Sequence, residues 1–164
     1  MDIPTHISEL VPNPDNERQH SPRGIGLIVD ALHKVGAARS IVIDEDNVIR
    51  AGNGTVEAAA EAGITKVVVI DADGSTLVAV RRTGLTPEQK RDLSLYDNRS
   101  AEFSSWRGDT LSKLATDGHD LSGLFTAKEL SKALTMTATA ATLTKGDATP
   151  ATTHVCPSCG HTWK

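Results

Sequence analysis

The sequence predicts a small α/β domain, in the α+β sense of a small mixed sheet with helices, followed by a helical extension and a flexible tail. Short apolar runs of strand length alternate with stretches whose apolar residues recur at helical spacing. After residue 135 the large apolar residues become rare, and threonine and alanine dominate. We therefore expect a domain over 1–104, a helical extension over 105–134, a linker over 135–153 and a separate tail over 154–164.

Composition narrows the class of protein. Aromatic residues make up only 3% of the 164 residues, so the core must be built from Val, Ile, Leu and Ala. The formal net charge of −4 argues against binding nucleic acid through overall charge, although a local basic patch is compatible with it. No apolar run approaches the roughly 20 residues of a membrane span, and the first residues do not resemble a signal peptide. We expect a cytoplasmic protein that does not enter a membrane.

The first third of the chain predicts strands around one long helix. Residues 6–11 form a plausible first strand, which the prolines and asparagines of 12–16 must end in a turn. Ser21 followed by Pro22 is typical of a helix N-cap, and Gly36 is a natural stop for that helix. A buried strand at 41–43 and a return strand at 48–51 should then pair across a polar turn.

The rest of the chain continues this alternation. A helix should open at Thr55 and end at Gly63, followed by a third core strand over 66–71. The dipeptide Asp73-Gly74 predicts a hairpin that pairs this strand with 76–81. Three further helices are expected, at Pro87–Leu95, Asp109–Ala115 and Ala127–Leu134.

The turn before the Thr55 helix is the strongest candidate for a binding site. The first backbone N–H groups of a helix have no partner within it, and the helix dipole makes that end positive. The two glycines let the main chain approach a ligand closely. We expect Gly52, Asn53, Gly54 and Thr55 to bind a phosphate or another anion. The alternative is an ordinary strand-to-helix turn that Thr55 caps.

The tail carries a second candidate site. Cys156 and Cys159 have the spacing of one zinc knuckle, in which a tight turn directs two thiolates at one ion. Structural zinc needs four ligands, so His154 and His161, or ligands from another subunit or partner, would complete the site. The alternative is a tail with two free thiols.

Taken together, these segments resemble the N-terminal domain of ParB-type proteins, of the ParB/sulfiredoxin-like superfamily. The resemblance rests on the run 11–16, the helix ending at Gly36, and 41–44 followed by the 49–55 loop. Asp97-Asn98-Arg99 after Leu85-Thr86 is similar to the version found in phage and prophage proteins. The resemblance covers roughly residues 5–115, and its order of elements is more specific than any one motif.

The resemblance implies a nucleotide, CTP or ATP/ADP with Mg²⁺, whose phosphates lie on the 52–55 loop. The sequence departs from the family pattern, because Asn53 replaces an acidic residue or histidine and Thr55 stands where arginine is usual. Arg18 or Arg23 is the candidate replacement for that charge. The resemblance also places the 13–20 loop, and Asn98 with Arg99, beside the nucleotide. Asp15 and Glu17 in that loop are candidates for a general base or a Mg²⁺ ligand; the alternative is a solvated turn.

Three functions remain open at this point. The first is a nucleotide-binding accessory or switch in phage or plasmid DNA metabolism or modification, with DNA or a DNA-processing protein as partner and a homodimer as a possible assembly. The second is an enzyme, a nucleotide hydrolase or a phosphotransferase resembling the free-serine kinase; nuclease activity is less expected because the chain lacks a two-metal carboxylate cluster. The third is a non-catalytic adaptor that presents the tail to a partner.

Overall fold

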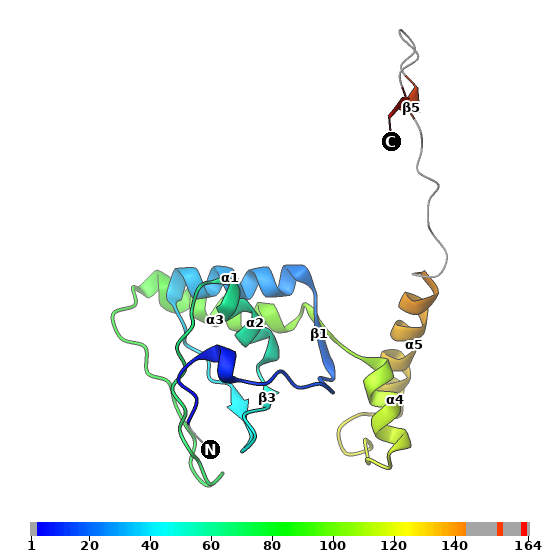
Figure 1. Cartoon of the computed structure of the whole chain (residues 1–164), viewed down its shortest axis with the longest axis horizontal. Helices are drawn as coiled ribbons and strands as arrows, with labels where there is room; N and C mark the ends of the chain where they lie inside the picture. The colour runs from blue at the N-terminus through cyan, green and yellow to red at the C-terminus, as the bar shows by residue number, and fades with distance from the viewer. Residues whose placement is uncertain (1–2, 144–153, 156–161, 164) are drawn as a thin grey trace.

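The computed structural model describes residues 3–143, 154–155 and 162–163, and the fold is a mixed α+β arrangement (Figure 1). Helix α1 (Pro22–Val35) packs along α3 (Pro87–Ala101) and against α2 (Asn53–Glu61). Helices α4 (Gly108–Thr116) and α5 (Ala127–Leu143) pack on each other beside this body (Figure 1). The candidate site lies where the two parts approach.

Both long helices begin at the caps that the sequence predicts. The Ser21 hydroxyl accepts a hydrogen bond from the Gly24 amide at 3.1 Å, and Pro22 opens α1. Thr86 forms a capping box with Gln89 at the start of α3. The predicted end of this second helix at Leu95 is wrong, because α3 continues to Ala101. An ion pair of 2.9 Å between Lys34 and Asp92 ties the two helices together.

The expected first strand over 6–11 is not a strand. Its middle is a 3-10 helix, η1 (Ile7–Glu9), held by local hydrogen bonds. The Glu9 carboxylate accepts from the Thr5 and His6 amides at 2.7 and 3.1 Å, and the His6 ring accepts from the Ser8 amide. These side-chain bonds compete with a strand ladder. Only the two ends of the run keep strand contacts, His6 with Lys66 and Val11 with Val48.

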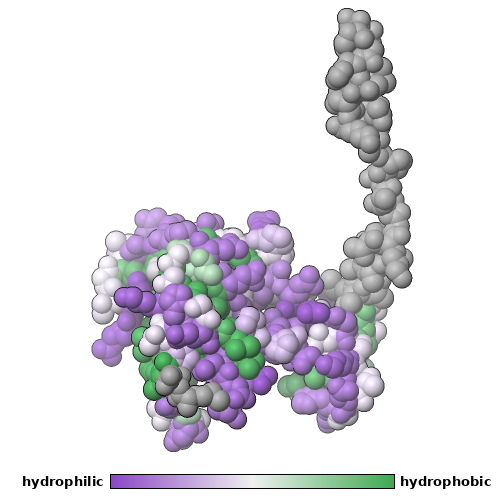
Figure 2. All heavy atoms as spheres, viewed as in Figure 1, coloured by the Kyte–Doolittle hydropathy of each residue, from purple (hydrophilic) through white to green (hydrophobic). Residues whose placement is uncertain are grey.

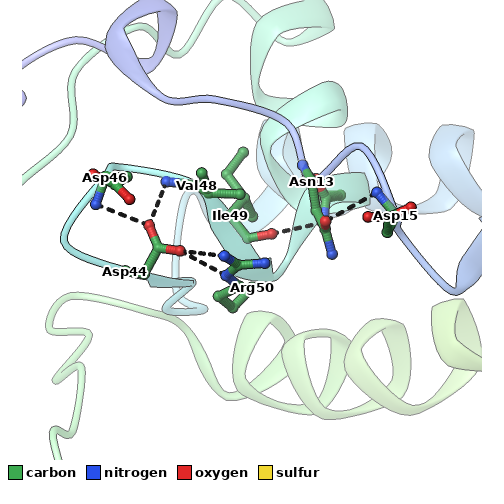
Figure 3. A network of polar contacts seen from close by, with 8 residues as sticks. Asn13, Asp15, Asp44, Asp46, Val48, Ile49 and Arg50 are labelled. Atoms are coloured by element: carbon green, nitrogen blue, oxygen red, sulfur yellow. Dashed lines mark hydrogen bonds and ion pairs between the residues drawn. The ribbon is translucent and has the colours of Figure 1, made fainter. Parts of the chain in front are cut away.

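The pairing of β2 (Val42–Ile43) with β3 (Ile49–Ala51) confirms the predicted antiparallel return. Asp44 shapes the turn, because its carboxylate accepts from the Asp46 and Val48 amides at 3.0 and 2.9 Å and pairs with Arg50 (Figure 3). The Val11–Val48 bridge is parallel, whereas the His6–Lys66 bridge is antiparallel. The expected single mixed sheet is therefore not formed by the described residues, which make separate two-stranded antiparallel pairs and two isolated bridges.

A pairing that the sequence does not signal joins β1 (Arg18–His20) to β4 (Ser104–Trp106). The two strands are antiparallel, with Arg18 opposite Trp106 and His20 opposite Ser104. The connection brings the polar loop after Val11 to the start of α4. This pairing forms one wall of the candidate site.

Helix α2 begins two residues before the predicted start at Thr55. Its N-cap is Gly52, in the left-handed region at φ 102°, where a Cβ would lie 2.5 Å from Cγ2 of Ile41. No side chain caps this end. Only glycine fits the turn, so the backbone turns sharply into the helix. The buried Ala58 and Ala59 let α2 lie close against α1.

The prediction of a core strand over 66–71 paired with 76–81 is wrong. Within the described residues, only Lys66 of this run takes part in a β-bridge. The turn itself forms, because the Asp73 carboxylate accepts from the Ser75 amide at 2.9 Å. Arg82 anchors the far end by donating to the carbonyls of Val35 and Ala37, both at 2.7 Å, at the C-terminal end of α1.

Helices α4 and α5 have their own small core of Leu111, Leu121 and Ala133. Helix α5 continues past the predicted end at Leu134 to Leu143, into the segment that the sequence predicts as linker. Farther on, β5 (His154–Val155) pairs antiparallel with β6 (Thr162–Trp163). Among the described helices, none has the length and apolar character needed to cross a membrane.

Candidate anion-binding cleft

A cleft of about 580 Å³ opens between β1, the first turn of α2 and the start of α4. Its walls come from three distant parts of the sequence, which the β1–β4 pairing brings together. The lining residues are Asn16, Arg18, Gln19, His20, Asn53, Gly54, Glu57, Arg107 and Asp109.

The first turn of α2 supplies the backbone of this cleft. The Thr55 amide is bonded to the Gly52 carbonyl at 2.9 Å, whereas the Asn53 and Gly54 amides precede any helical acceptor. The Asn53 side chain serves the fold instead. It accepts from the Asn13 amide at 3.0 Å and donates to the Ile49 carbonyl at 3.2 Å. The group of Asn53 that can bind a ligand is therefore its backbone amide, because its side chain is already hydrogen-bonded within the fold.

His20 lies against the same turn. A Cβ on Gly54 would lie 2.7 Å from Cδ2 and Nε2 of the His20 ring, so the glycine leaves room for the imidazole. Nδ1 of His20 is buried and has no hydrogen-bond partner among the described residues. Burial, followed by the charge of Arg18, lowers the pKa of His20, against the opposing effect of Glu57. The ring is thus held in its neutral form beside the positive end of the helix.

Two guanidinium groups and two carboxylates complete the lining. Arg18 stacks on Trp106, with its central carbon 4.6 Å from the ring centroid, and hydrogen-bonds the Ser104 hydroxyl. Arg107 pairs with Asp109 at 2.9 Å, which lowers the pKa of Asp109 and raises that of Arg107. Glu57 adds a second acid to the lining. The two positive and two negative formal charges cancel. Because Arg107 pairs with Asp109, Arg18 and the backbone amides are the donors not already committed to an acid.

Several predicted ligand residues lie elsewhere. Arg23 and Arg99 both stack on Phe103, each 4.7 Å from its ring centroid, and Arg99 also pairs with Glu102. Asn98 donates to the Ser94 carbonyl within its own helix at 2.9 Å. Gly52 acts as the N-cap, and Thr55 lines an apolar groove rather than the cleft. Of the predicted phosphate ligands, Arg18, Asn53 and Gly54 line the cleft together.

The two candidate catalytic acids also lie outside the cleft lining. Asp15 forms an exposed ion pair with Lys113 at 2.9 Å, and this bond lowers the pKa of Asp15. A carboxylate held in its charged form by an ammonium is a weak base. The Glu17 carbonyl accepts from the Arg107 amide at 2.8 Å, so this residue positions Arg107 through its main chain.

Sequence reasoning placed the 13–20 loop, which contains His20, beside the ligand, but it missed Arg107 and Asp109 as parts of the same site. Arg18 and Ser104 are 86 positions apart, and no local pattern signals that their strands pair. The one available signal was the polar 13–20 loop itself, which contains His20 next to the strand-forming Arg18 and Gln19. The structure shows that this loop faces α2 and the start of α4.

The predicted zinc ligands Cys156, Cys159 and His161 lie outside the described residues, and His154 begins β5. In the part of the chain that the structure describes, no three His, Cys, Asp or Glu side chains gather as a metal site. Comparison with known proteins identifies no relative: no family model, curated protein or solved structure matches the chain.

Proposed function

We propose that this chain binds the phosphate groups of a nucleotide in the cleft, and that it acts as an accessory or switch in DNA metabolism rather than as a strong catalyst. The observation that carries the proposal is the meeting of the α2 N-terminus with Arg18. Backbone amides at a helix N-terminus bind phosphate through hydrogen bonds and the helix dipole. Arg18 adds a planar donor for the same oxygens.

The stacking of Arg18 on Trp106 supports this role. The indole face and the Ser104 hydroxyl hold the guanidinium in one place, so less side-chain entropy is lost when a phosphate binds. The neutral form of the His20 ring, which its lowered pKa favours, can donate one further hydrogen bond in the same cleft. The Asn53 side chain fixes the turn by joining it to the polar loop.

Charge balance sets the expected strength and conditions of binding. The negative charges of Glu57 and Asp109 offset the positive charges of Arg18 and Arg107, so the lining has no net positive formal charge for a polyphosphate. Magnesium on the nucleotide phosphates reduces their charge and relieves the repulsion from the two acids. We therefore expect weak, Mg²⁺-dependent binding, with a Kd on the order of 10 μM to 1 mM.

Isothermal titration of the full chain with CTP, ATP, ADP and GTP, each with and without Mg²⁺, tests the proposal. Trp106 provides a second readout, because a ligand on Arg18 alters the environment of the ring beneath it. A Trp163→Phe background removes the only other tryptophan. We expect a fluorescence change that saturates at the same concentration as the heat.

The matched pair of variants is Arg18→Gln and Arg23→Gln. Both arginines stack on an aromatic ring, but only Arg18 lines the cleft. Losing a charged hydrogen-bond donor should weaken binding about 10- to 100-fold in Arg18→Gln and leave Arg23→Gln close to wild type. If no nucleotide binds, or if both variants lose binding equally, the proposal fails.

A further inference from the structure

The 66–82 segment exposes an unusual amount of apolar surface. Leu77 is 92% exposed and Val68 is 85% exposed, and the same segment exposes Ile70, Val78 and Val80. All five, together with the exposed Ile3 and Val42, line one open groove of about 1070 Å³. Figure 2 shows hydrophobic residues reaching the surface of the body that carries this segment.

These side chains lie on a segment whose sequence is that of a strand buried on both faces. In the run from Val67 to Ile70 every residue is apolar, and burial alternates, with Val67 and Val69 half-buried and their neighbours exposed. A run without a polar face is typical of strands covered on both sides. The body of this chain covers one face, and the backbone beyond Lys66 forms no ladder within the described residues.

The charges of the segment are arranged in a self-complementary way. Asp71 and Asp73 lie at the tip, on its N-terminal side, whereas Lys66 and Arg81 lie at the two ends near the base. Within the described part of the chain, Lys66, Arg81 and Asp71 take part in no ion pair. Two such segments laid antiparallel would place each acidic tip against the basic base of the other. In a dimer with a twofold axis, the same surface of each copy contacts the other, so this tip-to-base contact occurs twice.

We propose that the 66–82 segment is a dimerisation surface, and that its occupant is the same segment of a second copy in antiparallel orientation. The five exposed apolar residues of the segment, with Ile3 and Val42 beside it, present on the order of 800 Å² of surface; burying all of it would equal the area that each partner contributes to a standard interface. Pairing would also give hydrogen-bond partners to backbone N–H and C=O groups of the segment that form no β-ladder, as strand addition at a sheet edge does. This inference does not depend on the nucleotide cleft, because the segment contributes no residue to it.

The first test is the oligomeric state of the full chain by sedimentation equilibrium, up to about 100 μM, where an interface of this size should be populated. A Cys156→Ser, Cys159→Ser background removes any bridging by the tail. We expect a dimer that Leu77→Asp abolishes. The matched control is Leu124→Asp, which adds the same charge at a 71% exposed leucine between α4 and α5.

Charge reversal distinguishes this contact from any other. One variant carries Lys66→Glu and Arg81→Glu, and the other carries Asp71→Lys and Asp73→Asn, where Asn keeps an oxygen for the Ser75 turn. Each alone should dimerise about tenfold more weakly, because the twofold axis repeats every repulsion. An equimolar mixture of the two should restore the dimer as a heterodimer.

Far-UV circular dichroism of each variant checks that the fold is retained, since the side chains altered between residues 66 and 124 are exposed. A monomeric wild-type chain would overturn the proposal and indicate that the segment closes onto its own groove. A dimer that Leu77→Asp leaves intact, or a mixture that gains nothing over its components, would overturn it as well.

Discussion

The contact between Gly54 and His20 makes the sharpest prediction about the cleft. Replacing Gly54 with alanine places a methyl group 2.7 Å from Cδ2 and Nε2 of the ring, so the imidazole must move. Overpacking of this kind costs about 1–3 kcal/mol. Against it, alanine in a helix is favoured over glycine by about 0.5–1 kcal/mol. We expect Gly54→Ala to lower the free energy of unfolding by about 0.5–2 kcal/mol.

The same change should have the opposite sign once the ring is absent. A His20→Ala background removes the three atoms that lie nearest to the new methyl group, so Gly54→Ala should there stabilise the protein by up to about 1 kcal/mol. Gly26→Ala is the control, because Gly26 lies within α1 and a Cβ there would meet nothing within 4 Å. It should stabilise both backgrounds equally.

Urea denaturation of the wild type and the single and double variants measures this coupling directly. If Gly54→Ala stabilises the wild-type chain as much as it stabilises the His20→Ala variant, the ring does not lie against Gly54. The first turn of α2 would then have a different environment, and the cleft would have a different wall.

Three further predictions concern other parts of the fold. Arg82→Met should lower the free energy of unfolding by about 1–2 kcal/mol, measured in urea, because it removes two hydrogen bonds to carbonyls at the C-terminal end of α1. The pKa of His20 is lowered in the folded protein, so above its ordinary pKa of 6.5 the ring is neutral in both the folded and the unfolded state. As the pH falls below 6.5, the unfolded chain takes up a proton on this ring before the folded chain does, and the folded state loses stability down to the folded pKa. His20→Gln should flatten that decline in thermal midpoint between pH 7 and pH 5, and an unchanged slope would exclude His20 as its cause. Leu111→Ala should lower the free energy of unfolding by about 2–5 kcal/mol and speed amide hydrogen exchange in α4 and α5 but not in α1. Ile49→Ala should instead speed exchange in α1 but not in α4 and α5. If both variants speed exchange equally in all three helices, the two cores unfold as one unit.

The interactions that the sequence determined by itself span four residues or fewer. Ser21 with Pro22 and Thr86 with Pro87 mark the starts of α1 and α3, because a hydroxyl and a fixed φ act on the next turn of backbone. The turns at Asp44 and Asp73 form for the same reason, since each carboxylate accepts from amides two to four residues later. The glycine turn before α2 belongs to this class as well.

Tertiary structure alone decided which of these local pieces meet. The pairing of Arg18 with Trp106 built the cleft wall, and the sequence contains no signal for a contact over that separation. It also decided that Asn53 uses its side chain to hold the polar loop, and that Asp15 faces Lys113. Long-range pairing depends on which surfaces remain available after the local elements form. For that reason the apolar run from Val67 to Ile70, which the sequence predicts as a core strand, lies half-exposed and outside any β-ladder of the described residues.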